Sequence, residues 1–248
     1  MRVAVIVFVI GDHYIQSFEN KFKRNLEIYC QKYGYDLIIL DRLIIDDDPT
    51  NKKRFFWQRF LLPDKYREYD YVVSIDSDIF INENSPSLPF DIIPSGKIAA
   101  INERKYMGNY EWREGIQTRF GNEKTGREYH ALSGEIRDYD DVLNGGLVIY
   151  QPVYHADLML ELYHKNIDTY MKWHQDDQSI LSVYLIDNSM IYWLDERFNR
   201  IWFYWRELFY PAFNELSDSD KRRFVKNFID LNYFTHFTSG IDIQYIDI

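Results

Sequence analysis

The chain alternates between short apolar runs and segments with a helical spacing of apolar residues. Residues Val3 to Ile10 are rich in β-branched side chains and the run stops at Gly11, which predicts a buried parallel strand. After this strand, apolar residues recur at steps of three and four, the spacing of one helix face, and Gly34 is placed to end the helix. These residues are Phe18, Phe22, Leu26, Tyr29 and Tyr33.

The same reasoning divides the rest of the chain. Further apolar runs predict strands over 36–40, 71–75, 79–81, 97–102, 147–150, 191–194 and 233–237. Helices are predicted over 52–62, where Pro63 would end the helix, over 153–164, from about residue 176, and over 219–229. Residues 103–140 are polar without a clean period, which predicts a long mobile loop. Strands that alternate with helices, without a repeat or a shift in composition, predict one α/β domain over 1–248 with a mainly parallel central sheet flanked by helices.

Composition and charge exclude several classes of protein. The chain has 46% hydrophobic and 27% charged residues, as ordinary globular domains do. Its net charge of −10 argues against a nucleic-acid-binding protein, because such proteins neutralise phosphates with Lys and Arg. Cys30 is the single cysteine, which excludes an internal disulfide. No apolar run approaches the roughly 18 residues of a membrane span, and the apolar start leads to Gly11 rather than to a signal-peptide cleavage site, so we expect a cytoplasmic location.

The pattern Asp-x-Asp occurs four times, and its surroundings distinguish one copy from the others. Three copies lie in polar, turn-like stretches where carboxylates are normally solvated, at positions 46 and 48, 138 and 140, and 218 and 220. Only Asp76 and Asp78, on either side of Ser77, lie between two apolar runs, in YVVSIDSDIFI. Two carboxylates at the exit of a buried strand are costly to desolvate unless a positive charge offsets them. A divalent cation that also binds nucleotide phosphates would do so; the alternative is a pair of solvated loop carboxylates.

Around this pair the sequence resembles the GT-A fold glycosyltransferases, which take a sugar from a nucleotide-sugar. Among them it is most similar to the glycogenin-like and lipopolysaccharide-galactosyltransferase branch. The core of the resemblance is RFLLPDKYREYDYVVSIDSDIFI, residues 59–81, in which the matching positions are Arg59, Pro63, Tyr69, Asp70, Asp76 and Asp78. Further segments match in the same order along the chain. They are VFVIGDHY (7–14), LNGGLVIYQP (143–152), HQDDQSIL (174–181), LDERFNRIW (194–202) and HFTSG (236–240).

The resemblance implies a GT-A domain whose donor site contains a metal ion. It implies that Asp76 and Asp78 bind Mn²⁺ or Mg²⁺, which bridges the diphosphate of a nucleotide-sugar, with a UDP-sugar as the default donor. Ser77 is expected to contact the same nucleotide. His236 is implied as a third ligand, and its nitrogen favours Mn²⁺; the alternative is an ordinary strand-end histidine bonded to backbone.

The resemblance also assigns the loop after the first strand to the nucleoside. Gly11 would let the backbone approach the ligand, Asp12 would accept from the base or ribose, and Tyr14 would stack on the base. The alternative is a plain turn with Asp12 as a helix cap. Arg59 would bind phosphate or a sugar-binding carboxylate, or else be a surface charge of its helix.

Two further segments are expected to face the sugar and the acceptor. Asn144 would bond sugar hydroxyls and Gly145 would permit close approach, unless this segment is only a tight turn. Asp176 and Asp177 are expected near a helix start, where one caps the helix and the other acts on the acceptor as a general base if the reaction inverts. If the reaction retains configuration, Asp177 or Gln178 would lie beside the anomeric carbon. The polar segment 103–140 is expected to border this acceptor side.

The C-terminal motif departs from the family pattern. Gly240 is four residues after His236 rather than three, and no Lys follows, so Arg59 or the basic residues 52–54 are expected to supply the positive charge near the diphosphate. The leading hypothesis is a metal-dependent transferase with a glycan or protein-linked acceptor. The alternatives are a sugar-nucleotide-binding protein with little or no turnover, a nucleotidyltransferase, which would need a Gly- and Arg-rich loop that GDHYIQSFEN lacks, and a glycoside hydrolase, which needs no metal.

Overall fold

The computed structural model describes residues 1–45, 54–105, 107–120, 125–132, 134–170 and 177–247. The strands are β1 Val3–Phe8, β2 Asp36–Leu40, β3 Tyr71–Ile75, β4 Ile79–Ile81, β5 Ile98–Asn102, β6 Leu143–Tyr150, β7 Ile191–Trp193, β8 Arg200–Ile201 and β9 Phe234–His236. The helices are α1 Asp12–Ser17, α2 Lys23–Tyr33, α3 Arg54–Trp57, α4 Leu62–Lys65, α5 Glu111–Phe120, α6 Gly126–Ala131, α7 Pro152–Tyr170, α8 Gln178–Asp187, α9 Trp202–Phe209 and α10 Asp218–Leu231. A π turn over Phe18–Phe22 joins α1 to α2, and a 3₁₀ turn over Gln58–Leu61 joins α3 to α4.

The main sheet has the strand order β2-β1-β3-β6-β5-β7. β1 pairs in parallel with β2 and β3, and β5 pairs in parallel with β7. β6 runs antiparallel to both of its neighbours, β3 and β5. This confirms the predicted mainly parallel sheet, and it places the first residues of β6 beside the carboxyl ends of β3 and β5.

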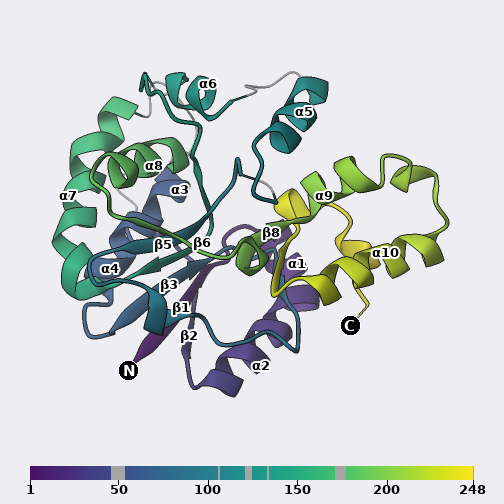
Figure 1. Ribbon diagram of the computed structural model, residues 1–248. Helices are drawn as coiled ribbons and strands as arrows, with labels where there is room; N and C mark the ends of the chain where they lie inside the picture. Colours follow the sequence, from purple (N-terminus) through teal and green to yellow (C-terminus); the bar gives the residue numbers. More distant parts are fainter. Residues whose placement is uncertain (46–53, 106, 121–124, 133, 171–176, 248) are drawn as a thin grey trace.

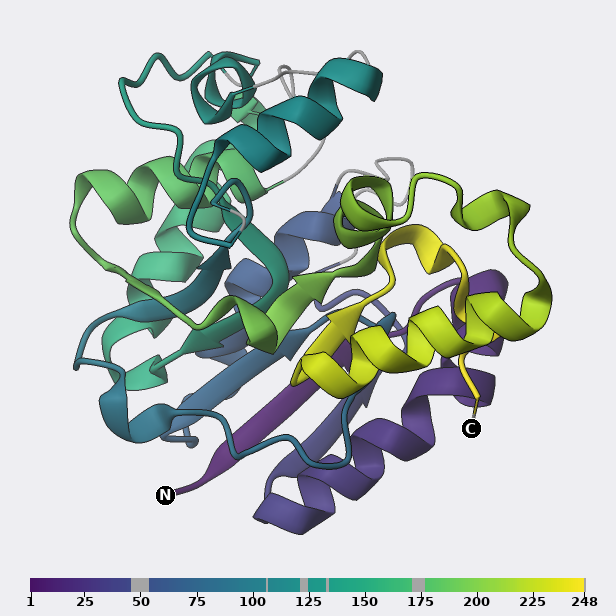
Figure 2. The same cartoon turned by 45° about the vertical axis from the view of Figure 1, so that its right-hand side comes forward.

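Side chains of β1 alternate between two apolar layers. Val3, Val5 and Val7 pack in the cluster that contains the buried residues of α2 and α10. Ala4 and Ile6 pack in the cluster on the other face, with residues of α4, α7 and α8. Figures 1 and 2 show these two groups of helices on opposite sides of the sheet. Because both faces of β1 are covered, the strand is apolar throughout instead of alternating with polar residues.

A small second sheet brings the C-terminal part of the chain to the main sheet. Its order is β4-β9-β8, with β4 antiparallel and β8 parallel to β9. Ile79 of β4 and Ile201 of β8 both lie opposite His236. The residue that ends β9 is therefore held next to the turn between β3 and β4.

The described parts of 103–140 include the helices α5 and α6, where the sequence pattern predicts a long loop. In α5 the ring of Trp112 lies 5.4 Å from the ring of Phe209 in α9. Thr125 caps α6 in a capping box that Glu128 completes. The prediction of a loop was therefore wrong over these two stretches.

Two predicted boundaries also differ from the structure. The helical segment predicted to end at Pro63 continues to Lys65, because Pro63 lies in the first turn of α4, where its missing N–H is not needed. The strand predicted from residue 147 begins at Leu143, so Asn144 and Gly145 lie within β6 instead of in a turn before it. Positions 46–53 lie outside the described residues, so the acidic pair at 46 and 48 and the basic residues 52 and 53 are not placed.

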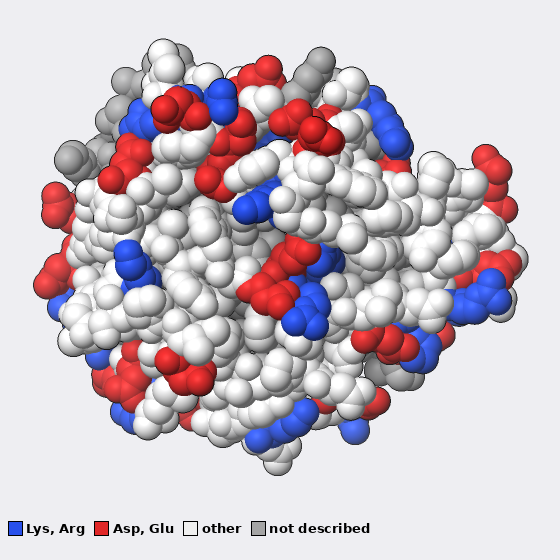
Figure 3. Space-filling view, viewed as in Figure 1, with Lys and Arg blue, Asp and Glu red and all other residues white. Residues whose placement is uncertain are grey.

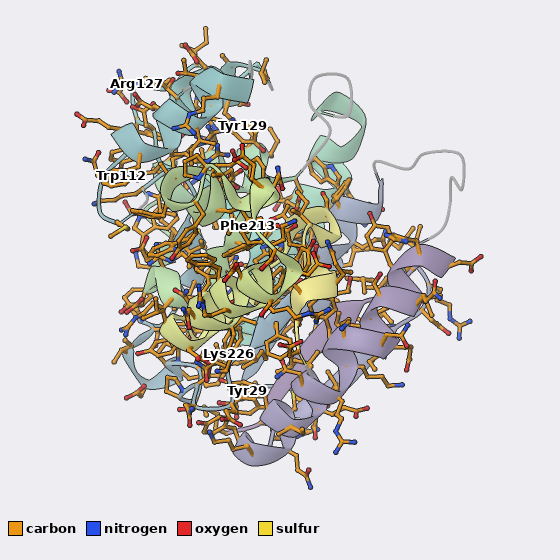
Figure 4. All side chains as sticks on the ribbon, turned by 90° about the vertical axis from the view of Figure 1, so that its right-hand side faces the viewer. Tyr29, Trp112, Arg127, Tyr129, Phe213 and Lys226 are labelled. Carbon is orange, nitrogen blue, oxygen red and sulfur yellow. The ribbon has the colours of Figure 1, made fainter. Side chains whose placement is uncertain are left out.

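Charges of both signs are spread over the surface. Figure 3 shows acidic side chains along the upper edge of the view, with Lys and Arg side chains among them. Figure 4 shows Trp112 of α5 and Tyr129 of α6 at the top of the molecule, far from Tyr29 of α2. Among the described helices, none combines the length and the apolar character that crossing a bilayer requires.

Candidate active site

Asp76, Asp78 and His236 meet at the edge of the sheet where β3 ends. Asp76 follows β3 directly, and Asp78 precedes β4. His236 is the last residue of β9, which pairs with β4. His236 Nε2 lies 3.2 Å from Asp78 Oδ1 and 3.7 Å from Asp76 Oδ2. Each of the three side chains offers one ligand atom, and these atoms lie within 4.8 Å of one another. The structure thus brings the three predicted ligands into one site, the metal trio.

The donor atoms of the metal trio fit a divalent cation. Burial raises the pKa of Asp76, although Arg59 and His236 oppose the rise. Burial alone would lower the pKa of His236, but the carboxylates of Asp78 and Asp76 outweigh it and raise the pKa. The pKa of Asp76 is thus raised mainly by burial, and that of His236 by the two neighbouring carboxylates. Two carboxylate oxygens and one imidazole nitrogen form a set that Mn²⁺ accepts readily and that can also bind Mg²⁺.

Arg59 lies beside the metal trio and is buried instead of being a surface charge. Its Nε lies 2.7 Å from Asp177 Oδ2, and its Nη2 lies 3.7 Å from Asp76 Oδ1. Nη1 donates to the carbonyl oxygen of Gly145. One guanidinium therefore connects the start of β6, the start of α8 and the end of β3, and the surface-charge alternative is wrong.

The two glycines at the start of β6 make room for neighbouring side chains. A Cβ at Gly145 would lie 2.8 Å from the guanidinium carbon of Arg59, and a Cβ at Gly146 would lie 2.5 Å from Cε1 and 2.6 Å from Nδ1 of His236. Real Cβ atoms do not approach other atoms so closely. At Gly146 the obstacle is the imidazole ring of His236, whereas at Gly145 it is the end of the Arg59 side chain, which would have to move. Both glycines lie in β6, so the tight-turn alternative is wrong. Whether a sugar also approaches here stays a prediction.

Asp177 and Gln178 both face this part of the site. Asp177 precedes the first residue of α8, but its side chain makes no capping hydrogen bond and instead lies against Arg59. Gln178 Oε1 accepts from the backbone N–H of Gly145 at 2.7 Å. The capping alternative is therefore wrong for Asp177. Asp176 lies outside the described residues.

The predicted nucleoside loop follows β1, which lies next to β3 in the sheet. Gly11 has φ of 95°, a conformation that glycine adopts easily. It precedes α1, where no side chain caps the helix, so Asp12 is not the cap that one alternative proposed. Tyr14 is 54% exposed, which leaves its ring accessible to a ligand. The assignment of this loop to a nucleoside stays a prediction.

Sequence reasoning assigned no role to two residues that connect to the metal trio. Glu103 follows β5 and accepts hydrogen bonds from Asn144 and Arg113. Burial alone would raise the pKa of Glu103, but Arg113 and Arg104 outweigh burial and lower it. Asn199 lies within the segment LDERFNRIW, and its Oδ1 is 3.0 Å from His236 Nδ1. The only available signals were the strand end before Glu103 and the family motif around Asn199.

A small cavity lies beside these residues. Its volume is about 10 Å³, room for about one water molecule. Its walls come from β5, from the turn before β8 and from α9. The lining residues are Ile101, Asn102, Glu103, Glu196, Asn199, Arg200, Ile201 and Tyr204. Asn199 thus lines this cavity and also contacts His236, whereas Glu103 lines the cavity and reaches the metal trio only through Asn144 and Asn199.

Solved structures similar to this chain are glycosyltransferases. A glycosyltransferase involved in glycosylation of the major capsid of PBCV-1 is 12% identical, with a TM-score of 0.58, and the match covers 99% of this chain and 97% of that one. The bifunctional glycosyltransferase WbbM is 14% identical, with a TM-score of 0.61, over 96% of this chain and 46% of that one. Mouse xyloside xylosyltransferase 1 is 12% identical, with a TM-score of 0.54, over 97% and 99% of the two chains.

The likeness extends over nearly the whole chain and shows that it has the GT-A fold. This confirms the fold that the sequence resemblance implied. No family model matches the sequence, and the search of curated proteins found no match.

Proposed function

We propose that this protein is a metal-dependent glycosyltransferase that moves a sugar from a nucleotide-diphosphate sugar, a UDP-sugar, to a glycan or protein-linked acceptor. The observation that carries the proposal is the metal trio at the carboxyl edge of a GT-A sheet, adjacent to Arg59, Asp177 and Gln178. Ligands of open α/β sheets bind at this edge. The similar glycosyltransferase structures support the same reading.

The proposed roles follow from the contacts. Asp76, Asp78 and His236 would hold Mn²⁺, which when bound neutralises the charge that builds on the departing nucleoside diphosphate. Arg59 would place its positive charge between the diphosphate and Asp177. A carboxylate beside a guanidinium is a weak base. We therefore assign Asp177 an electrostatic role near the anomeric carbon and not the removal of a proton from the acceptor.

The loop after β1 would bind the nucleoside, with Tyr14 stacked on the base. Gln178 would bond a hydroxyl group of the donor sugar from the start of α8. The amide of Asn144, expected to do the same, is held by Glu103, Gly146 and Asn199 instead.

A thermal-shift panel of nucleotide-sugars, with and without Mn²⁺, tests the proposal. At a ligand concentration of 100 Kd, binding stabilises the fold by about 2.7 kcal/mol. In a chain of this size that raises Tm by about 5–10 °C. We expect UDP-sugars to give this shift only with Mn²⁺ present. Equal shifts with and without Mn²⁺ would contradict the metal requirement.

A matched pair of variants separates the metal trio from other acidic pairs. Asp78→Asn should remove Mn²⁺-dependent UDP binding, measured by calorimetry, together with turnover. Asp218→Asn, in an acidic pair at the start of α10, should leave both unchanged. The alternative is a sugar-nucleotide-binding protein, which the absence of Lys from the C-terminal motif supports. It would be favoured if a UDP-sugar bound normally but was neither transferred nor slowly hydrolysed.

A further inference from the structure

A buried chain of hydrogen bonds links Glu103 to the metal trio. Asn144 Nδ2 donates to Glu103 Oε2 at 3.0 Å, and Asn199 Nδ2 donates to Asn144 Oδ1 at 2.7 Å. The last link joins Asn199 Oδ1 to His236 Nδ1 at 3.0 Å. Asn144, Asn199 and His236 are 6%, 0% and 3% exposed, so water competes little for these groups. The direction of each hydrogen bond is therefore decided by protein partners.

Two partners with fixed chemistry set the orientation of Asn144. The first is Glu103, which accepts from Arg113 Nη2 at 3.1 Å, and an ionised carboxylate can only accept. The second is the backbone N–H of Gly146, which can only donate and lies 2.8 Å from Asn144 Oδ1. Asn144 therefore turns its NH₂ group toward Glu103 and its oxygen toward Gly146. A flipped amide would lose both hydrogen bonds.

The orientation of the Asn144 amide determines that of Asn199, which contacts the imidazole of His236. The oxygen of Asn144 accepts, so Asn199 presents its NH₂ group there and its own oxygen to His236. An oxygen acceptor requires a hydrogen on His236 Nδ1. In the neutral ring Nε2 then carries the lone pair, and Nε2 is the atom that faces Asp78 and Asp76.

We propose that Asn199 is a positioning residue of the metal centre: it holds His236 in the Nδ1–H tautomer, so that Nε2 is free to coordinate the cation. This inference rests on the proposed function, because it requires that the metal trio bind a cation. Partners behind a ligating imidazole fix its tautomer and ring orientation, and their removal typically weakens metal binding 10–100-fold. A merely structural Asn199 would affect folding stability but neither the tautomer nor the affinity for the cation.

Calorimetric titration with Mn²⁺ alone tests the inference on wild type and Asn199→Leu. Asn199→Leu should bind Mn²⁺ about 10–100-fold more weakly. Asn232→Leu is the matched control, since Asn232 is 4% exposed and its Nδ2 donates to the carbonyl of Phe228 within α10. It should bind Mn²⁺ as wild type does.

The proton on Nδ1 is read from the ¹⁵N shifts of the His236 ring in protein loaded with diamagnetic Mg²⁺, because without a cation the carboxylate of Asp78 would itself favour a hydrogen on Nε2. Wild type should show a protonated Nδ1 that is protected from exchange, and Asn199→Leu should lose this protection. A ring with its hydrogen on Nε2 in Mg²⁺-loaded wild type overturns the inference, whether or not Asn199→Leu folds. Equal Mn²⁺ affinity in wild type and Asn199→Leu, or an equal loss in Asn232→Leu, also overturns it. If wild type binds no Mn²⁺, the metal requirement of the proposed function fails first.

Discussion

Removal of the Arg59 charge tests the electrostatics of the site in a quantitative way. Arg59 and Asp177 are 9% and 2% exposed, with Nε and Oδ2 2.7 Å apart. In Arg59→Met, the carboxylate of Asp177 stays buried without its guanidinium, which lowers the free energy of unfolding. The loss cannot exceed the free energy of protonating Asp177 instead, which is about 1.36 kcal/mol for each pH unit above an ordinary pKa of about 3.9. The largest loss is therefore about 4 kcal/mol at pH 7 and about 1.5 kcal/mol at pH 5.

The sign follows from the protonation states. In this variant the pKa of Asp177 is higher in the folded than in the unfolded state, so stability is lost as pH rises. Urea unfolding at pH 5, 6 and 7 should show that the deficit relative to wild type grows by up to about 2.7 kcal/mol from pH 5 to pH 7. Adding Asp177→Asn should remove this dependence. Arg67→Met, which breaks an exposed ion pair, should show little effect. A deficit that is independent of pH, or that Asp177→Asn does not change, would refute the reasoning.

Three further outcomes are expected. Gly146→Ala should displace the ring of His236 and lower Mn²⁺ affinity at least about tenfold in calorimetry, whereas Gly115→Ala in α5, where a Cβ meets open space, should bind normally. The pKa of Glu103 lies below its ordinary value of 4.5, so its ionised form stabilises the fold above pH 4.5. This contribution disappears as pH falls through the pKa of the folded state. Glu103→Gln should therefore lose less stability than wild type when urea unfolding is repeated at acid pH. Hydrogen exchange over 111–131 should slow when a UDP-sugar and Mn²⁺ bind; equal protection in both states would count against a role for α5 and α6 at the acceptor side.

The strands of the main sheet could be predicted because burial on both faces leaves an unambiguous apolar signal. Residues 3–8 and 71–75 are almost wholly apolar, and Gly34, with φ of 69°, ends α2 as predicted. The acidic pair Asp76 and Asp78 stood out for the same reason, since it interrupts an apolar run. The sequence therefore predicted the sheet and the position of the candidate metal site within it.

Helix α5 was missed because its buried side chains are not all apolar. Arg113 and Gln117 are 3% and 5% exposed, alongside Ile116 at 0%. Arg113 replaces apolar packing by its ion pair with Glu103 and by stacking on Tyr204, 3.6 Å from the ring centroid. Such partners are remote in the sequence, so periodicity cannot show them. For α6, in contrast, the T-x-x-E pattern at 125–128 was a readable capping signal.

The orientation of β6 is what assembles the site. Parallel strands bring their carboxyl ends to one edge, and a strand that runs the other way brings its amino end there. Ile75 therefore pairs with Leu147, and the N–H of Asp76 donates to the carbonyl of Gly146 at 2.9 Å. A sequence pattern does not reveal strand direction. The strand was predicted to start only at residue 147 because Asn144 and the two glycines are not strand formers, although they lie in β6.

The charges around the site pair off except at the metal trio. Arg59 lies 2.7 Å from Asp177, and Arg113 lies 3.1 Å from Glu103, so each of these carboxylates has its own guanidinium. The two carboxylates of the metal trio share one imidazole and a guanidinium that is already paired and lies no closer than 3.7 Å. An anionic diphosphate would be repelled from this edge unless a divalent cation balanced the two negative charges first. In a chain with a net charge of −10, this excess of negative charge among the described residues supports the proposal that a cation binds together with the anionic donor.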